Sequence, residues 1–335
     1  LEGPISISSP ENIKINQNNY GRNFYLVKDS YGTWTLIQKI KYENYLAGVL
    51  PHEIGANSPL EALKAQAVIA RTWAIYNSDR FSIDKYHLCI TTQCQVYKPP
   101  KVQNKNIQKA IKDTSDLIIT YQDKPINSFY HASNGGISAS SSESWKMDDF
   151  SYFNPMIDGV KSLKNNYKIP IKNKIELSKF LDNANEKIYG NNHRLFRWKK
   201  KISSEAIQNL LITKKLLHKQ DELFELKIIE RGPSGRVTKL AIQQNTFKKK
   251  VILEKDDIRR ILGFLPSNLF IINKLNDNFW LFKGGGFGHG VGLSQSGAIE
   301  MAELGFNYEQ ILKHYYQGTK IKKLRILYQL SNQQK

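Results

Sequence analysis

The sequence of 335 residues contains no long hydrophobic run. No stretch of it approaches the ~18 consecutive apolar residues that a transmembrane helix requires, so we expect no membrane-spanning helix. A secretory hydrophobic segment is also lacking, and the first residue is Leu1 rather than Met. We therefore expect any signal or membrane anchor to have been removed or to lie outside this chain.

Acidic residues are scarce compared with basic ones. The chain has 30 Asp and Glu against 49 Lys and Arg, which gives a formal net charge of +19. Such a balance favours polyanionic partners, namely nucleic acid, anionic lipid or an acidic cell wall. The basic residues come in short runs such as 197–201 and 320–323, and no helix-turn-helix, zinc-finger or RNA-recognition motif accompanies them. We therefore expect no nucleic-acid partner.

Cysteine is nearly absent, because Cys89 and Cys94 are the only two in the chain. Two cysteines five residues apart could form a local disulfide, bind a metal together with the nearby His87, or remain free. A disulfide that closes so short a loop adds little stability, roughly 2 kcal/mol or less. One His and two thiolates are ligand types that zinc prefers, with a fourth position open. The spacing leaves these alternatives open.

The remaining composition predicts a folded α+β protein. Hydrophobic residues make up 40% of the chain, enough for a core. Residues 1–45 alternate apolar and polar positions between glycine and aspartate breakers, which is typical of short strands. Residues 160–225 are Lys-rich and helical in pattern, so we predict an inserted subdomain within a core domain of residues 1–159 and 226–335. The pattern also predicts a helix at 105–114 and strands at 117–121, 126–131, 226–230 and 237–243.

The most informative segment surrounds Glu53. This carboxylate lies in an apolar stretch broken by Pro and Gly, just before a strongly patterned helix. Apolar surroundings raise the pKa of a carboxylic acid, as a general acid requires. Ser58 is the expected N-cap of the helix, with Pro59 at its first position and Glu61 completing a capping box. The alternative is a buried helix with Glu53 as an ordinary solvated residue.

A second informative segment has six glycines within residues 284–292, with His289 between two of them. Glycines permit positive φ angles and close backbone approach, so such a loop can press against a ligand or serve as a structural turn. It is neither a phosphate-binding loop nor a dinucleotide fingerprint. A helix is expected to begin near Ser294 and to end at Gly305. Residues 133–144, small and polar, predict either a flexible loop or an active-site rim.

Three of these segments together resemble the stage II sporulation protein D family (SpoIID/LytB). They are the Glu53 segment with its helix PLEALKAQAVIARTWA, the CQVY segment at 94–97, and GFGHGVGLSQSGA at 286–298. Shorter matches agree, namely YHASNGG at 130–136, DGVKS at 158–162 and SGRV at 234–237. The resemblance runs from about residue 40 to residue 325, apart from the predicted insertion.

The resemblance implies a lytic transglycosylase that cuts peptidoglycan glycan strands stripped of their stem peptides. The bond cut would lie between N-acetylmuramic acid and N-acetylglucosamine, leaving a 1,6-anhydro end. The family's catalytic glutamate falls on Glu53, which would act first as general acid and then as base. Substrate-binding side chains are then expected at Arg71, Tyr97, His289, Ser294 and Gln295.

The resemblance also bears on cofactors, partners and location. Some members bind zinc through residues that correspond to His87, Cys89 and Cys94, although the reaction requires no cofactor. Expected partners are glycan strands and other wall hydrolases such as an amidase, outside the cytoplasmic membrane. The first alternative is a non-catalytic wall-binding enhancer of an amidase. The second, a zinc hydrolase of the stem peptide, would need a metal-activated water at the same three residues.

Overall fold

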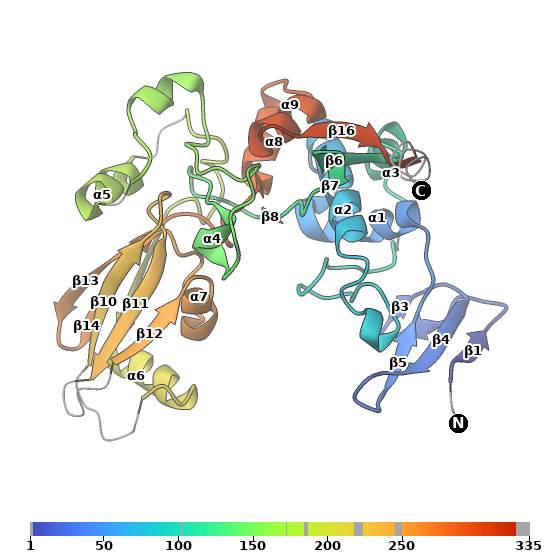
Figure 1. Ribbon diagram of the computed structural model, residues 1–335, viewed down its shortest axis with the longest axis horizontal. Helices are drawn as coiled ribbons and strands as arrows, with labels where there is room; N and C mark the ends of the chain where they lie inside the picture. Colours follow the sequence, from blue (N-terminus) through green and yellow to red (C-terminus); the bar gives the residue numbers. More distant parts are fainter. Residues whose placement is uncertain are drawn as a thin grey trace. The chain divides into compact units, whose positions relative to one another are not determined.

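The computed structural model describes residues 3–101, 103–171, 173–183, 187–217, 224–244 and 250–325. Helices and several small sheets alternate along the chain (Figure 1), which confirms the predicted α+β class. The chain forms two compact units. Unit 1 comprises residues 1–129, 305–312 and 319–335, and unit 2 comprises residues 130–304 and 313–318. Within the described ranges, no helix is both long and apolar enough to cross a membrane.

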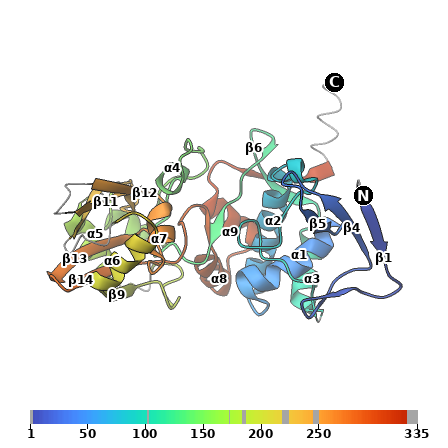
Figure 2. The same cartoon turned by 90° about the horizontal axis from the view of Figure 1, so that it is seen from below.

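Unit 1 begins with a small antiparallel sheet, as the alternating pattern of residues 1–45 predicted. Its strand order is β1-β4-β5, and both ribbon views show β4 beside β5 (Figures 1 and 2). A two-residue ladder, β2 with β3, lies between the first two of these strands in sequence. The bounds are β1 (Ile5–Ser8), β2 (Lys14–Ile15), β3 (Asn18–Asn19), β4 (Asn23–Lys28) and β5 (Trp34–Ile37).

A buried helix, α2 (Leu60–Tyr76), forms the centre of unit 1. Its alanines are fully or almost fully buried, and their small side chains let neighbouring elements approach closely. Helices α1 and α3 and strand β6 all contact it. The bounds of the other elements are α1 (Tyr42–Leu50), η1 (Pro51–Gly55), η2 (Ser82–Asp84), α3 (Lys105–Asp113), β6 (Leu117–Tyr121), β7 (Lys124–Pro125) and β16 (Lys320–Lys323).

The start of α2 differs from the predicted capping box. Pro59 is the N-cap, and no side-chain cap hydrogen bond is present. Ser58 instead donates its hydroxyl to the carbonyl of Ile54, 2.8 Å away. Glu61 accepts hydrogen bonds from Lys64 and from the backbone N–H of Tyr308. The preceding residues are themselves helical, so the serine satisfies a carbonyl at the end of that segment rather than an N–H of the next.

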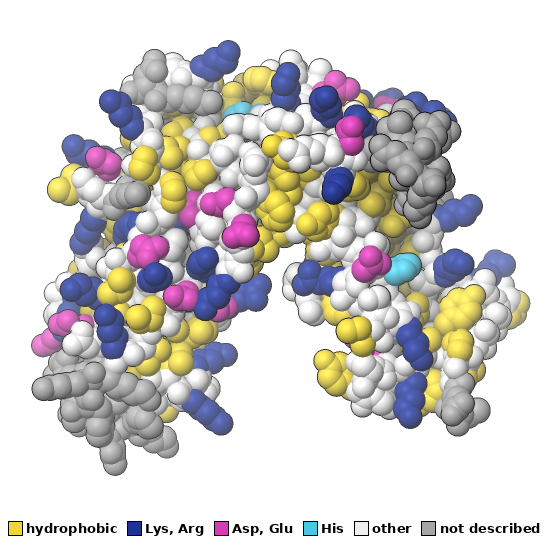
Figure 3. Space-filling view, viewed as in Figure 1, with side chains coloured by type: hydrophobic (Ala, Val, Ile, Leu, Met, Phe, Trp, Pro, Cys, Tyr) yellow, Lys and Arg dark blue, Asp and Glu magenta, His cyan; other side chains and the backbone are white. Residues whose placement is uncertain are grey.

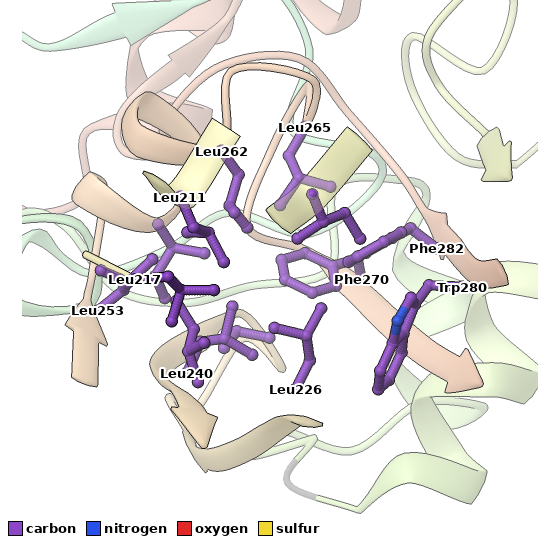
Figure 4. Close-up of a cluster of buried hydrophobic side chains, with 14 of the residues drawn as sticks. Leu211, Leu217, Leu226, Leu240, Leu253, Leu262, Leu265, Phe270, Trp280 and Phe282 are labelled. Atoms are coloured by element: carbon purple, nitrogen blue, oxygen red, sulfur yellow. The ribbon is translucent and has the colours of Figure 1, made fainter. Parts of the chain in front are cut away.

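Unit 2 contains two three-stranded sheets, with orders β10-β11-β12 and β13-β14-β9. Both sheets and helices α6 and α7 contribute side chains to one apolar cluster, drawn in Figure 4. Phe270 and Phe282 from the second sheet pack there with Leu240 from the first. The bounds are β9 (Trp198–Ser203), α6 (Ser204–Thr213), β10 (Phe224–Arg231), β11 (Val237–Gln244), β12 (Lys250–Glu254), α7 (Asp257–Leu262), β13 (Phe270–Asn276) and β14 (Phe279–Gly284).

The predicted insertion at 160–225 is not a unit of its own. Its strand β9 pairs along its whole length with β14, so it belongs to a sheet with residues 270–284. Its helix α5 (Lys174–Asp182) contributes Leu177 and Phe180 to a second cluster with Leu269 and Ile271. The boundary between the units therefore falls after residue 129, because side-chain packing joins the Lys-rich segment to the residues that flank it on both sides.

The rest of unit 2 is built around short elements. Strand β8 pairs in parallel with β15, which leads directly into α8. The expected helix start is confirmed, because Ser294 is the N-cap and accepts from the N–H of Gly297 at 3.4 Å. The bounds are β8 (Tyr130–His131), α4 (Ser141–Ser144), η3 (Lys161–Asn165), β15 (Leu293–Ser294), α8 (Gln295–Glu303) and α9 (Tyr308–Tyr315), the last of which runs from unit 1 into unit 2.

Candidate active site

Glu53 lies on a single π-helical turn, η1, which continues directly from α1. The sequence predicted an irregular segment here, whereas the chain stays helical and widens. π-Helical turns are rare and occur frequently at functional sites. Gly55 ends the turn with a φ angle of +94°, a conformation that residues with a side chain rarely adopt. The turn therefore gives Glu53 a fixed backbone position between two helices.

The carboxyl group of Glu53 is held by the segment that carries the cysteines. Oε1 of this half-buried side chain accepts a hydrogen bond from the backbone N–H of Val96 at 2.7 Å. The preceding residue, Gln95, is fully buried and accepts from the hydroxyl of Tyr45 at 3.1 Å. Residues 94–97 are thus bound both to the Glu53 turn and to α1, which fixes the direction of the carboxyl group.

Two tyrosines lie next to this carboxyl group. The rings of Tyr45 and Tyr97 stack with centroids 5.5 Å apart, and both side chains are buried. Burial, and then the negative charge of Glu53, raises the pKa of Tyr45, so its hydroxyl remains a donor at neutral pH. Tyr97 was predicted to offer a stacking face to substrate. One face of its ring is stacked on Tyr45, and Tyr97 contributes to the lining of two cavities.

These two cavities both belong to unit 1. The polar cavity, of about 1020 Å³, is lined by residues of the η1 turn, of segment 97–108 and of the N-terminal hairpin region. Pro51, His52 and Ala56, on or next to the turn that carries Glu53, contribute to its wall. The apolar cavity, of about 920 Å³, lies between the N-terminal sheet and the cysteine segment. A ligand in the polar cavity would therefore lie beside the Glu53 turn.

Arg71 does not occupy a substrate-facing position. It is 1% exposed, and its guanidinium bonds to the Glu43 carboxylate at 2.8 Å and to the carbonyl of Leu117 at 3.0 Å. These contacts join α2 to α1 and to β6. Burial and bonding give Arg71 a structural role, in place of the predicted contact with substrate.

Cys89 and Cys94 are joined by a disulfide, while His87 is exposed. Zinc binds cysteine as thiolate, and a disulfide has no thiolate to offer. Within the part of the chain that the structure describes, no group of three or more His, Cys, Asp or Glu side chains is placed to hold a metal ion. As arranged here, the three residues do not fit a zinc site.

This arrangement predicts a metal-free protein. Protein purified without reductant should contain no titratable thiol and far less than one equivalent of zinc. Reduction should release two thiols and leave the Glu53 carboxyl group in place, because the hydrogen bond from Val96 to Glu53 uses the backbone rather than a sulfur. Thiol titration and elemental analysis of the same sample measure both quantities. About one zinc per chain, with Zn–S distances near ~2.3 Å, would instead support the metal site.

In unit 2, backbone groups engage both ring nitrogens of His289. Nε2 lies 3.0 Å from the carbonyl of Tyr130, and Nδ1 accepts from the N–H of Val291 at 3.1 Å. An acceptor at Nδ1 and a donor at Nε2 define the neutral imidazole. The ring packs against Trp145 and His131, with centroids 4.8 Å and 5.1 Å away. These contacts favour the structural alternative for His289 over a direct bond to a sugar.

The Gly-rich loop, residues 284–292, packs closely against residues 133–136. Ser133 and Phe287 exchange two backbone hydrogen bonds. A Cβ at Gly135, where φ is +68°, would lie 2.6 Å from the carbonyl carbon of Gly285. The segment predicted to be a flexible loop or an active-site rim is thus mostly buried against the Gly-rich loop. Close backbone approach, rather than ligand binding, accounts for the glycines at this contact.

Ser294 and Gln295 are also buried, at 0% and 8% exposure. Besides capping α8, the Ser294 hydroxyl accepts from the N–H of Asn134 at 3.3 Å. Their predicted contacts with sugar hydroxyls stay predictions. So does the hypothesis that His289 faces one cleft with Glu53, because the two residues belong to different units.

We expect His289 to make the stability of unit 2 pH-dependent. Burial lowers the pKa of His289 to about 4, whereas an unfolded histidine titrates near ~6.5. As pH falls from ~6.5 to ~4, the unfolded state binds a proton that the folded state does not. The free energy of unfolding should therefore decrease by up to ~1.4 kcal/mol per pH unit in this window.

Replacement of His289 by Gln, which can still donate to the Tyr130 carbonyl, should reduce this slope. Urea unfolding of both proteins at pH 7, 6 and 5 measures the difference. Some slope should remain, because burial also holds the pKa of His131 well below its usual value. Equal slopes in the two proteins would contradict the titration. A variant as stable as the unmodified protein at all three pH values would contradict the structural role of His289.

Sequence reasoning missed the groups that orient Glu53. The hydroxyl of Tyr45, the side chain of Gln95 and the N–H of Val96 together position the segment that binds its carboxyl group. Two signals were available. Tyr45 lies two helical turns before Glu53 on a continuous helical segment, and Gln95 directly follows Cys94. Neither signal predicts that the two segments meet, because 43 residues separate the bonded pair.

Comparison with known proteins places these features in a family. The sequence model described as stage II sporulation protein matches residues 30–121, and that of a domain of unknown function (DUF8618) matches residues 139–292. Stage II sporulation protein D of Bacillus amyloliquefaciens is 30% identical over 308 residues, which cover 85% of this chain and 75% of that protein. The chain belongs to the stage II sporulation protein D family. The resemblance drawn from its motifs is therefore confirmed.

Two other relatives show how widely the similarity extends. An uncharacterised protein of Brachyspira hyodysenteriae is 30% identical over 295 residues, covering 86% of this chain and 68% of that protein. The amidase enhancer of Bacillus subtilis (strain 168) is 27% identical over 293 residues, covering 82% of this chain. The chain spans only 40% of the length of that enhancer. The SpoIID match falls within unit 1, which carries Glu53, and the second match falls within unit 2.

Proposed function

We propose that this member of the stage II sporulation protein D family is a peptidoglycan lytic transglycosylase. Its substrate is a glycan strand stripped of stem peptides, cut between N-acetylmuramic acid and N-acetylglucosamine. The observation that carries the proposal is the position of Glu53, a single carboxylate on a π-helical turn beside a large polar cavity. Among the described residues that line this cavity, none is Asp or Glu.

One carboxylate suits this reaction better than hydrolysis. Most glycoside hydrolases need two carboxyl groups, one as acid and one as base or nucleophile. In the lytic reaction, Glu53 gives its proton to the glycosidic oxygen as the bond to the anomeric carbon breaks. The resulting carboxylate then takes the proton of the sugar's C6 hydroxyl while that oxygen bonds to the anomeric carbon. Glu53 is thereby protonated again, and a 1,6-anhydro ring replaces the glycosidic bond.

The products of digestion test the proposal. Peptide-free glycan strands incubated with the full chain should yield fragments with 1,6-anhydro-N-acetylmuramic acid ends, detected by mass spectrometry. Reducing ends would mean a hydrolase and would overturn the proposed chemistry. Intact strands that nevertheless bind the protein would favour a non-catalytic enhancer of an amidase. The similarity to the protein named amidase enhancer supports that second candidate.

The proposal includes a location outside the cytoplasmic membrane, where the glycan strands lie. The disulfide between Cys89 and Cys94 supports it, since disulfides persist in oxidising compartments and are rare in the cytosol. The net charge of +19 also suits an acidic wall polymer.

A further inference from the structure

The polar cavity of unit 1 has an unusual lining. Nine of its side chains are Asn or Gln, five carry a positive charge, and none of the described residues in the lining carries a negative one. The cations are Arg22, Lys39, Lys41, Lys98 and Lys101. Amide groups offer both donors and acceptors, as sugar hydroxyls and N-acetyl groups require. The cations add a preference for a ligand with negative charge.

One wall of this cavity is fixed by the helical core. Gly48 in α1 lets segment 97–98 lie directly on the helix, since a Cβ there would come within 2.5 Å of the Lys98 carbonyl oxygen. The N–H of Lys98 donates to the carbonyl of Gly48 at 3.2 Å. Asn104 caps α3 and donates to the carbonyl of Ala56 at 3.2 Å, which joins this wall to the Glu53 turn. Lys98 and the Glu53 turn thus have fixed relative positions.

The other wall comes from the N-terminal region. Residues 12–23 and 38–41 contribute to it, and the first of these segments precedes residue 30, where the SpoIID match begins. Backbone hydrogen bonds between Ile13 and both Tyr20 and Gly21 close the hairpin that carries Arg22. Part of the cavity wall therefore lies outside the segment that the family model matches.

The cavity brings five cations together without an acidic side chain among the described residues of its lining. None of them forms an ion pair with another described residue. Lysines elsewhere in unit 1 do find partners, as Lys64 does with Glu61 and Asp113. Over the N-terminal sheet, at the lower right of Figure 3, dark-blue Lys and Arg side chains outnumber magenta ones. An anion in the cavity would relieve the repulsion among these charges.

We propose that the polar cavity is a subsite for an acidic sugar, and that its cations bind the free lactyl carboxylate of N-acetylmuramic acid. The amides would bind the hydroxyl and N-acetyl groups of the same residue and its neighbour. The identity of the sugar rests on the proposed function. A stem peptide converts the lactyl carboxylate into a neutral amide, so this subsite would favour stripped strands. Its volume lies at the upper end of the roughly 300–1,000 Å³ typical of ligand sites, enough for more than one sugar.

Binding of two matched glycans tests this subsite. One is a peptide-free glycan fragment, and the other is the same fragment with its lactyl carboxylates converted to methylamides. Calorimetry on the full chain should show about tenfold weaker binding of the methylamide form, as expected for the loss of a few partly exposed ion pairs. Binding of the unmodified fragment should weaken as salt rises from 50 to 200 mM, while the neutral form should change little.

Two variants separate the cavity from the general surface charge. The double variant Lys39→Gln/Lys41→Gln should bind the acidic fragment several-fold more weakly and should distinguish the two fragments less, because Arg22, Lys98 and Lys101 remain. Lys28→Gln removes the same kind of charge from an exposed position of β4 outside the cavity, and should keep full discrimination. Melting temperatures of all three proteins should agree, because the replaced side chains are exposed.

Equal affinity of the unmodified protein for the two fragments, or equal loss in Lys28→Gln, would overturn the subsite. These outcomes differ from failure of the proposed function. Carboxylate-dependent binding without cleavage would support the subsite and contradict the proposed transglycosylase activity. Anhydro products formed at equal rates from both fragments would support the transglycosylase activity and contradict the subsite.

Discussion

Replacement of Glu53 by Gln should slow glycan cleavage at least ~10²-fold, as expected when a general acid is removed. The fold should be unchanged, because the amide oxygen of Gln can still accept the hydrogen bond that the N–H of Val96 donates at 2.7 Å. Gln can neither give a proton to the glycosidic oxygen nor take one from the C6 hydroxyl. The release of anhydro-ended fragments over time measures the rate, and calorimetry measures glycan binding, which should persist.

A matched variant, Glu61→Gln, controls for the loss of a negative charge in unit 1. Glu61 lies in the first turn of α2, pairs with Lys64 and accepts from the N–H of Tyr308. Because these contacts are partly exposed and do not involve the Glu53 turn, we expect its rate to stay near that of the unmodified protein and its stability to fall by less than ~1 kcal/mol. Near-normal turnover of Glu53→Gln, or an equal loss in Glu61→Gln, would rule out Glu53 as the proton donor.

The elements that periodicity predicted well are those fixed by their own local sequence. The alternating strands of the N-terminal sheet and helices α2 and α3 lie close to their predicted positions. In α3, for example, the buried side chains of Ile107, Ala110 and Ile111 recur at the period of a helix. The N-cap at Ser294 was also predicted correctly, because the hydroxyl accepts from an N–H only three residues away. Local chemistry sufficed in these cases.

The predictions that failed depended on partners distant in sequence. The 160–225 segment looked like an insertion because it is Lys-rich, yet its strand β9 completes a sheet with residues 270–284. Arg71 was expected to bind substrate, but Glu43 and Leu117 bind it within unit 1. Local residue spacing does not predict these two contacts, because Glu43 and Leu117 lie 28 and 46 residues away from Arg71 in sequence.

The candidate site also combines features that the sequence predicted with features that depend on contacts between distant segments. The motif around Glu53 indicated the carboxyl group that we propose as the proton donor. The π-helical turn that carries it was not predicted, because an extra residue in a helical turn leaves no periodic signal. The cations of the polar cavity contribute to the net charge, but the sequence did not predict that they cluster. Arg22, Lys41 and Lys98 come from separate segments that meet only when the N-terminal hairpin packs on the core.

Several family motifs of unit 2 meet at one buried carboxylate. Asp158, from the DGVKS segment, is 0% exposed and accepts from three side chains. Asn134 donates at 2.6 Å and the Tyr315 hydroxyl at 3.0 Å to one oxygen, while Nε2 of His314 lies 2.8 Å from the other. Gly297 leaves space for this group, because a Cβ there would lie 3.0 Å from the Asp158 carboxylate. Motifs that looked like separate candidates for a site thus share one structural network.

Asp158→Asn should therefore destabilise unit 2 by about 3 kcal/mol or more. The amide would keep one acceptor oxygen and turn an NH₂ group toward side chains that themselves donate, so at least one buried donor would lose its partner. Asp123→Asn makes the same chemical change at an exposed ion pair with Lys322, 2.6 Å long, and should cost less than ~1 kcal/mol. Urea unfolding followed by tryptophan fluorescence compares the variants. A loss of unfolding free energy in Asp158→Asn no larger than that in Asp123→Asn would contradict the network.

The same variant should affect activity little. Because Asp158 belongs to a different unit from Glu53, the rate of glycan cleavage by Asp158→Asn, measured well below the unfolding midpoint, should fall far less than that of Glu53→Gln.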